Sequence, residues 1–332
     1  MKKFIIAASC ALLTMGACAG SGAKTVEDSA AVAETENTLP KVYFIKDITP
    51  EALMKVYKAL GVEPSGRVAV KISTGESSQS NQLSPELIKD LVTEVKGTLV
   101  ECNTAYGGNR GTTENHLKAI KERGYDKIAT VDIMDSEGSI DIPVQDTTWI
   151  KHNKVGAHLA NYDYLINLAH FKGHAMGGFG GVLKNQSIGI ASSDGKAYIH
   201  TAGAHEDVKD AFKNPNGQDA FIESMAVAAQ SVHDYFKGNV LYIDVMNNLS
   251  VDCDCDGHPH DPEMKDVGIL ASLDPVALDQ ACLDLVFNYD SKDGDNAAAL
   301  QERINSRHGT HIIDYAVKLG LGSKEYQLIT IE

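Results

Sequence analysis

The chain lacks several features that would assign it to a common class. After residue 17 it has no apolar run long enough to span a bilayer. It has no excess of positive charge, since 45 acidic residues outnumber 30 basic ones and the formal net charge is −15. No Gly-Lys-Ser/Thr phosphate loop, dinucleotide fingerprint or nucleophile elbow can be found. The charge disfavours nucleic acid and anionic membrane surfaces as partners, and the missing motifs disfavour a P-loop enzyme or a serine hydrolase.

The first residues predict export. Lys2 and Lys3 precede an apolar run at 4–17, which is too short to span a bilayer and is typical of a secretory signal. The run ends in Leu-Thr-Met-Gly-Ala before Cys18, which resembles the lipobox of bacterial lipoproteins and predicts acylation of Cys18. Ordinary signal cleavage nearby is the alternative. We expect a signal at 1–17, a lipidated flexible tether at 18–39, and an exported protein held on a membrane of the bacterial cell envelope only through its lipid anchor.

Residues 40–332 have the pattern of an α/β fold. Runs rich in Val and Ile alternate with helical patterns, which predicts a mostly parallel sheet flanked by helices. We expect residues 40–332 to form either one domain or two closely joined lobes with a boundary near 206–218. The predicted strands are 42–46, 67–73, 98–103, 128–133, 164–169, 240–246, 267–272 and 327–331. The predicted helices are 50–60, 85–95, 113–123, 218–236, 275–287 and 311–319. Thr49 and Ser84 are expected to cap helices, and Gly61, Gly124 and Gly320 to end them.

Three polar segments follow predicted strands, where ligands of such sheets bind. They are 71–76, 102–111 and the Gly-rich stretch 170–185. Successive N–H groups in a Gly-rich loop can hold an anionic oxygen, and two lysines add positive charge to it. We expect a pocket for a small anionic molecule with a carboxylate or phosphate group; a tight structural turn with satisfied histidines is the alternative. The predicted ligand-binding residues are Lys71, Arg110, Lys172, Gly178, Gly180, Gly181, Lys184, Asn185 and His200.

The segment 252–261 contains two thiols, two imidazoles and four carboxylates, and it is the predicted metal site. In an extended segment the two cysteines point to one side and the aspartates to the other. A disulfide between them would close a small strained ring, whereas both thiolates can reach one ion. Thiolates and imidazoles favour iron or zinc. The predicted metal ligands are Cys253, Cys255, His170, His174, His258 and His260.

Other interpretations of the same cysteines and carboxylates stay open. Residues 252–263 match the letters of an EF-hand calcium loop, but a predicted strand precedes them and Pro259 replaces a needed backbone donor. A calcium site of another kind, or a purely structural loop with reduced cysteines, is also compatible with the pattern. Cys102 and Cys282 are available to pair with each other.

Several motifs together resemble the family named domain of unknown function 362. They are the segments 68–71, 109–112, 170–174, 178–185, 253–255, 266–269 and 272–281. Members of this family are often labelled uncharacterized iron-sulfur centre proteins, and many carry an inserted ferredoxin module after the position that matches His200. Residues 205–218 contain no cysteine, so we expect no ferredoxin-type cluster module here. The resemblance implies the core with its Cys-Asp-Cys element and leaves the reaction unspecified.

The leading hypothesis is an envelope lipoprotein that binds a metal through Cys253 and Cys255 beside a pocket for a small anion. Redox or Lewis-acid catalysis is compatible with such a site. A non-catalytic lipoprotein that captures a small anion for uptake or sensing is the alternative. A third hypothesis is a metal-free enzyme with His170 or His174 as general base. Whether the protein is an enzyme stays open at this point.

Overall fold

The central sheet of the computed structural model has eight strands in the order β12-β1-β11-β10-β7-β2-β3-β4. The structure describes residues 39–332, which cluster as one unit. Strand β11 pairs antiparallel with both of its neighbours, and the other pairings in this sheet are parallel. The predicted α/β class with a mostly parallel sheet is therefore confirmed. The lobe boundary near 206–218 stays a prediction, and the signal, Cys18 and nearly all of the tether lie outside the described residues.

The elements have the following bounds. The strands are β1 (Lys41–Ile45), β2 (Val68–Lys71), β3 (Thr98–Glu101), β4 (Val131–Ile133), β5 (Ser139–Ile142), β6 (Asn153–Gly156), β7 (Tyr164–His170), β8 (Lys172–His174), β9 (Gly178–Gly180), β10 (Val240–Met246), β11 (Gly268–Ser272) and β12 (Gln327–Thr330). The α-helices are α1 (Pro50–Ala59), α2 (Pro85–Glu94), α3 (Thr113–Arg123), α4 (Val182–Ser187), α5 (Ser193–His200), α6 (Gly217–Tyr235), α7 (Pro275–Phe287), α8 (Ala298–Ser306) and α9 (His311–Lys318). Short 3-10 helices are η1 (Tyr125–Lys127), η2 (Ala157–Asn161) and η3 (Val208–Asp210).

The predicted strands and helix ends are confirmed. All eight predicted strands lie in the large sheet, and the six predicted helices form within one or two residues of their expected bounds. The Thr49 and Ser84 side chains accept from backbone N–H groups of α1 and α2, respectively. Gly61, Gly124 and Gly320 have positive φ angles of 67°, 83° and 76°, which glycine adopts without strain. Among the described residues, no helix is both long and apolar enough to cross a membrane.

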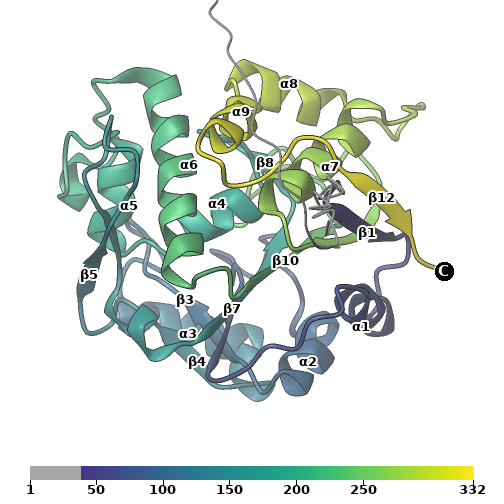
Figure 1. Cartoon of the computed structure of the whole chain (residues 1–332), viewed down its shortest axis with the longest axis horizontal. Helices are drawn as coiled ribbons and strands as arrows, with labels where there is room; N and C mark the ends of the chain where they lie inside the picture. The colour runs from purple at the N-terminus through teal and green to yellow at the C-terminus, as the bar shows by residue number, and fades with distance from the viewer. Residues whose placement is uncertain (1–38) are drawn as a thin grey trace, which may run out of the picture. The chain divides into compact units, whose positions relative to one another are not determined.

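Helices cover both faces of the sheet (Figure 1). The helices α1, α2 and α3 pack on one face, where Leu53 and Leu91 join Ile166 in one apolar cluster. The helices α4, α6, α7 and α9 pack on the other face, where Leu165 and Leu278 belong to a second cluster. Because every residue of β7 is buried, this strand is covered on both faces and lies in the middle of the molecule's core.

The site forms at the carboxyl ends of four adjacent strands. Lys71, Glu101, His170 and Met246 are the last residues of β2, β3, β7 and β10, which are neighbours in the sheet. Because β11 runs opposite to β10, the segment 247–267 leaves and re-enters the sheet at this same edge. Strands rather than helices flank this segment, so it lacks the helix-loop-helix frame of an EF-hand.

Candidate functional site

The loops at this edge enclose a cavity of about 90 Å³. It is lined by Lys71, Ser73, Glu101, Cys102, Thr104, Ala105, Tyr106, Arg110, Lys172, His174, Gly180, Gly181, Lys184, Asn185, Ile188, Gly189, Lys196, His200, Cys253, Asp254 and Cys255. All three polar segments predicted to follow strands contribute to the wall, and so does the Cys-Asp-Cys segment. Five lysine and arginine side chains face two carboxylates here, which gives a positively charged cavity in an acidic protein.

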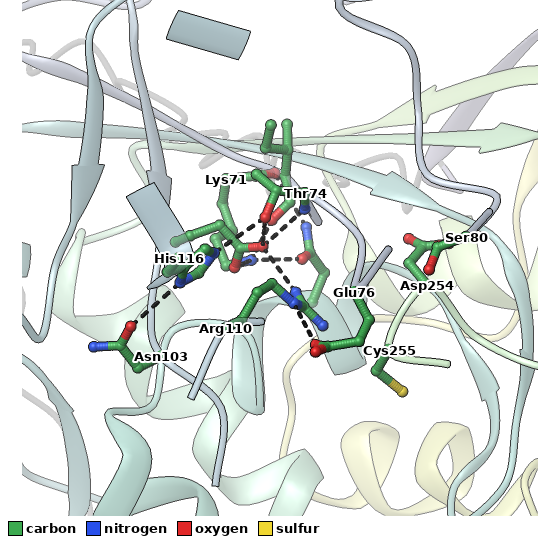
Figure 2. Close-up of polar contacts among 12 residues, drawn as sticks. Lys71, Thr74, Glu76, Ser80, Asn103, Arg110, His116, Asp254 and Cys255 are labelled. Atoms are coloured by element: carbon green, nitrogen blue, oxygen red, sulfur yellow. Dashed lines mark hydrogen bonds and ion pairs between the residues drawn. The ribbon is translucent and has the colours of Figure 1, made fainter. Parts of the chain in front are cut away.

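Glu101 is the centre of a buried ion-pair network in this wall. Its carboxylate lies 3.0 Å from Lys71 Nζ and 3.3 Å from Arg110 Nη1, and it accepts from the Thr74 N–H at 2.9 Å. Burial opposes ionisation of Glu101, but Lys71 and Arg110 outweigh it and lower its pKa to about 2. Figure 2 shows Lys71, Thr74 and Arg110 converging at this point. Arg110 also pairs with Glu76 at 3.2 Å, so these loops are joined by charge.

His116 holds the outer side of this network in the neutral state. Its Nε2 lies 3.1 Å from Thr74 Oγ1 and its Nδ1 lies 3.3 Å from Asn103 Oδ1 (Figure 2). Because the Asn103 oxygen only accepts, Nδ1 carries the proton and Nε2 accepts from the threonine hydroxyl. Burial lowers the pKa of His116 to about 3, which agrees with this assignment. Sequence reasoning placed no role on this histidine.

Asp254 is the second buried carboxylate of the cavity. It accepts from His170 Nδ1 at 2.8 Å and from Lys172 Nζ at 2.8 Å. Burial alone would raise the pKa of Asp254, but Lys172 and His170 hold it well below its ordinary value. His170 Nε2 faces the Asn247 carbonyl oxygen at 2.6 Å. Both ring nitrogens of His170 therefore face acceptors, and only the imidazolium form satisfies both.

The segment that carries the cysteines is fastened to loops on both sides. Gly173 N–H donates to Ser250 O at 2.8 Å, and a Cβ atom at Gly173 would lie 2.2 Å from Val251 O. Glu76 N–H donates to Asp254 O at 2.8 Å on the opposite side. The close approach explains why glycine occupies position 173, and the two contacts fix where the cysteines enter the cavity.

The structure joins Cys253 and Cys255 in a disulfide, contrary to the expectation of separate thiols. The expectation assumed an extended segment. Instead the chain turns here, since Asp256 N–H donates to Cys253 O at 2.9 Å. The turn brings the two Cα atoms to 5.2 Å, a separation that disulfides commonly have. Cys102 and Cys282 do not pair in the structure; both are buried free thiols.

His174 is the imidazole that the fold brings to the two sulfurs. Ligand atoms of His174, Cys253 and Cys255 all lie within 4.8 Å of one another, which makes them a possible metal-binding group once the disulfide is reduced. Gly177 N–H donates to His174 Nδ1 at 2.8 Å. The ring proton of the neutral side chain therefore lies on Nε2, and this nitrogen would have to lose that proton before it could bind a metal ion. Burial holds the pKa of His174 well below its ordinary value.

The other predicted metal ligands lie elsewhere. His170 is occupied by Asp254 and Asn247, and among residues 39–332 it is not part of the group at the sulfurs. His258 is exposed and lies 2.6 Å from Gln79 through its Nδ1. His260 is exposed and is paired with Asp252. The sequence cluster thus separates in space, because the turn at Asp254 points the cysteines inward and leaves both later histidines on the surface.

Most of the predicted ligand-binding residues meet in the cavity. Lys71, Arg110, Lys172, Gly180, Gly181, Lys184, Asn185 and His200 line it. Gly178 does not line it: its φ is 84°, and a Cβ atom there would lie 2.8 Å from Gly309 Cα. Its backbone therefore serves packing against the segment between α8 and α9 rather than the cavity wall.

His200 and Lys196 enter the cavity from helix α5. This helix was not predicted from the sequence. His200 is 7% exposed, its ring stacks against Phe212, and its Nδ1 is buried without a hydrogen-bond partner among the described residues. Burial and the neighbouring lysines lower the pKa of His200 to about 3, so the imidazole is neutral. Lys196 Nζ donates to Ala191 O.

Sequence reasoning also missed the two carboxylates and Tyr106. The signal for Glu101 was its position, since it is an acidic residue that ends an apolar strand directly before a polar loop. Asp254 lies between the two cysteines, but the pattern gave no reason to separate it from Asp252 and Asp256. Tyr106 contributes a hydroxyl within 3.2 Å of Arg110 Nη2, and no pattern in the sequence indicated that contact.

A buried carboxyl pair supports the cavity from behind. Asp279 of α7 accepts from the N–H groups of Val182 and Leu183 at 2.8 and 3.0 Å, which caps the start of α4. Burial raises the pKa of Asp279 to about 6. Burial and the nearby Asp279 carboxylate raise the pKa of Asp244 well above its ordinary value. Both shifts disfavour ionisation of this pair, and Asp279 holds the start of the helix that carries Lys184.

A comparison with protein families decides where this chain belongs. The sequence profile of the family Domain of unknown function (DUF362) matches residues 68–284. The chain belongs to the DUF362 family. The match begins at β2 and ends within α7, so it includes the strand ends, the Gly-rich loop and the Cys-Asp-Cys segment that form the cavity. No curated protein matches this DUF362 chain significantly.

Two solved structures resemble this DUF362 protein at low sequence identity. The lactate racemase apoprotein from Thermoanaerobacterium thermosaccharolyticum is 15% identical, with a TM-score of 0.39, and the match covers 61% of this chain and 50% of that one. A protein from Thermotoga maritima is 13% identical, with a TM-score of 0.39 and coverage of 68% of this chain and 55% of that one. The chain thus spans about half the length of the solved chains it matches.

Proposed function

We propose that the protein binds a small anionic molecule in the cavity, next to a metal ion held by His174, Cys253 and Cys255. The proposal rests on one observation, which is that anion-binding side chains and possible metal ligands lie in the same cavity wall. Cationic side chains from β2, β8, α4, α5 and the loop after β3, together with the possible His-Cys-Cys group, line the same cavity of about 90 Å³. The cationic residues and the His-Cys-Cys group come from several separate segments of the sequence, so the fold brings them together.

The charge balance supports an anionic guest. Glu101 compensates Lys71 and shares Arg110 with Glu76, while Asp254 compensates Lys172 and His170. Lys184 and Lys196 remain without a carboxylate partner among residues 39–332. Lys196 is buried, and a buried positive charge without a counterion is costly. A carboxylate or phosphate from solution supplies that counterion.

The donor set favours zinc or iron. Two thiolates and an imidazole are soft to borderline ligands, and three protein ligands leave a further position on the ion open. Reduction of the disulfide by two electrons must come first, since the sulfurs of the bonded form are not thiolates. A metal ion bound there would supply Lewis-acid or one-electron chemistry beside the anion.

Metal content is the direct test of the metal part. Protein reduced without oxygen and loaded with Zn²⁺ or Fe²⁺ is expected to retain about one ion per chain. Cys253→Ser and His174→Ala are expected to weaken metal affinity by more than about 100-fold, since losing even a supporting residue of a metal ligand costs 10- to 100-fold. The ion content is measured by elemental mass spectrometry after gel filtration.

Two control variants remove the same kinds of side chain, a thiol and an imidazole, outside the His-Cys-Cys group. Cys282→Ser removes a buried thiol that does not line the cavity, and His258→Ala removes an exposed imidazole of the same segment. Both should keep the wild-type metal content. Reduced wild-type protein without metal, or equal content in Cys253→Ser and Cys282→Ser, would contradict the metal site.

The disulfide favours a second candidate, an anion-binding protein without catalysis. In the bonded form the sulfurs are unavailable to a metal, whereas the lysines and Arg110 keep their places around the cavity. Such a protein would capture a small anion for uptake or sensing. It predicts that a ligand stabilises the oxidised protein against heat, and that Cys253→Ser leaves this stabilisation unchanged.

We also propose that the protein is exported and anchored by acylation of Cys18. The lipobox-like sequence supports this proposal, and a disulfide is compatible with an oxidising compartment. In a bacterial host, the wild-type protein is expected in the membrane fraction with the mass of an acylated N-terminal cysteine. Cys18→Ser should release it or leave the signal uncleaved, whereas Cys10→Ser, within the predicted signal, should change nothing. Equal fractionation and unmodified mass in wild type and Cys18→Ser would overturn the proposal.

A further inference from the structure

We propose that Lys184 is a nucleophile that forms an imine with a small 2-oxo acid held in the cavity. This inference rests on the proposed anion site and names its substrate class. It assigns to Lys184 a role different from that of the other lysines in the wall, and the difference follows from what each amine contacts.

The Lys184 amine is free, whereas the neighbouring amines are engaged. Lys71 Nζ contacts Glu101, the Ile72 carbonyl oxygen and Asn185 at 2.5 to 3.1 Å. Lys172 Nζ contacts Asp254 at 2.8 Å, and Lys196 Nζ donates to a backbone oxygen. For Lys184 Nζ, no hydrogen bond or ion pair is found within residues 39–332. An amine that holds no structural contact is available to a ligand.

The surroundings of Lys184 favour the neutral amine, which is the reactive form. Burial lowers its pKa to about 7, and the positive charges of Lys172, Arg110 and Lys71 act in the same direction. Asp254 acts in the opposite direction, but that carboxylate is already compensated by Lys172 and His170. A substantial fraction of Lys184 is therefore unprotonated near neutral pH, as imine-forming lysines require.

The position of Lys184 is fixed by its helix. It is the third residue of α4, whose first N–H groups are held by Asp279 of α7. At Gly181, directly before the helix, a Cβ atom would lie 2.3 Å from Asp279 Oδ1. This tight junction fixes the backbone from which the Lys184 side chain reaches the cavity. A reacting group held in place lowers the entropic cost of the reaction.

Both functional groups of a 2-oxo acid, the carboxylate and the carbonyl group, would find partners in the cavity. Its carboxylate would pair with Lys196, which lines the cavity and has no carboxylate partner among residues 39–332, and the cavity of about 90 Å³ admits only a small molecule. In the metal-free protein, His174 offers its Nε2 proton to a ligand oxygen. The carbonyl carbon adjacent to the carboxylate would then lie within the reach of Lys184.

The reaction is balanced without a further reagent. The lone pair of the Lys184 nitrogen forms a bond to the carbonyl carbon, and the carbonyl π electrons move to the oxygen. Both hydrogens of the amine leave with that oxygen as water, while the nitrogen forms the C=N bond. No oxidant or reductant takes part, so neither the disulfide nor a metal is needed for this step.

Borohydride trapping with pyruvate tests the inference. Full-length protein mixed with pyruvate and reduced with borohydride is expected to gain the mass of one N-alkyl adduct, located on the peptide that contains Lys184. Lys184→Arg keeps the charge but cannot form an imine, and it should lose the adduct. Lys89→Arg, an exposed position of α2, should label as the wild type does. An adduct that persists in Lys184→Arg, or that is spread over exposed lysines, overturns the proposal.

Thermal stabilisation by propionate and by pyruvate separates this inference from the proposed function. Propionate has the carboxylate of pyruvate but no carbonyl group, so it reports anion binding alone. If both acids stabilise the wild-type protein but no adduct forms on Lys184, the imine is excluded and the anion site stands. If neither acid stabilises the protein and no adduct forms, both proposals fail. Stabilisation by both acids with a single adduct at Lys184 supports both.

Discussion

Replacing Glu101 by glutamine is expected to lower the free energy of unfolding by about 3–5 kcal/mol, because the change leaves buried charges unpaired. Glu101 is 3% exposed and balances Lys71 and Arg110. The glutamine amide cannot supply the lost negative charge, and its NH₂ group would face one of the two cations. Urea unfolding of wild type and variant at neutral pH measures the difference.

Acid provides an independent check on the same carboxylate. The folded-state pKa of Glu101 is about 2, below its ordinary value of 4.5, so its contribution is present above pH 4.5 and is lost as the pH falls through about 2. The stability difference between wild type and Glu101→Gln should therefore shrink over this range.

The exposed pair of Lys324 and Asp314 offers the matched control for Glu101. Asp314→Asn should lower the free energy of unfolding by less than about 1 kcal/mol, since the side chains of Asp314 and Lys324 are both about half exposed to solvent. Equal effects of Glu101→Gln and Asp314→Asn would show that the buried network does not have the energetic role assigned to it.

Asp254→Asn is expected to have a loss of similar size, about 3–5 kcal/mol, for a related reason. The carboxylate is buried between Lys172 and the imidazolium of His170, at 2.8 Å from each. Asparagine keeps the shape but removes the charge, so two cations remain close together without compensation. Despite its lower stability, the variant should still bind added anions tightly, because an anion can replace the missing charge.

Asp256→Asn provides the comparison on the same segment. Asp256 is exposed, and within residues 39–332 its side chain accepts only from the nearby His258 N–H. Its replacement should change the free energy of unfolding by less than about 1 kcal/mol. If both variants unfold at the same urea concentration, the ion pairs of Asp254 contribute little, and the explanation given for the depressed pKa of this carboxyl group fails as well.

The sheet was predictable because most of its strands are apolar and alternate with helix signals. The runs at 240–246 and 275–287 have the bounds that hydrophobic pattern and capping residues indicate. The small hairpin of β8 and β9 and the helix α4 were not predictable in this way. The two strands are short and rich in glycine. Helix α4 has only six residues and begins where Asp279, almost a hundred residues later, accepts its first N–H groups.

The site was predictable to the level of its loops, and less so to the level of its side chains. Strand ends on a parallel sheet meet at one edge, so Lys71, Arg110 and Lys184 could be expected to converge. The disulfide was not expected, because a turn at Asp254 cannot be recognised from an alternating Cys-Asp pattern. Nor could the pattern distinguish His174, which reaches the sulfurs, from His170, whose two nitrogens are both occupied.

The reversed direction of β11 has a consequence for how this architecture can change. The connection between β10 and β11 leaves and returns on one side of the sheet, so residues can be added or removed there without shifting the register of any strand. One exchangeable stretch of chain carries both sulfurs, while the amines come from the rigid frame. Evolution can thus alter the soft-ligand chemistry of this architecture and leave its affinity for negative charge in place.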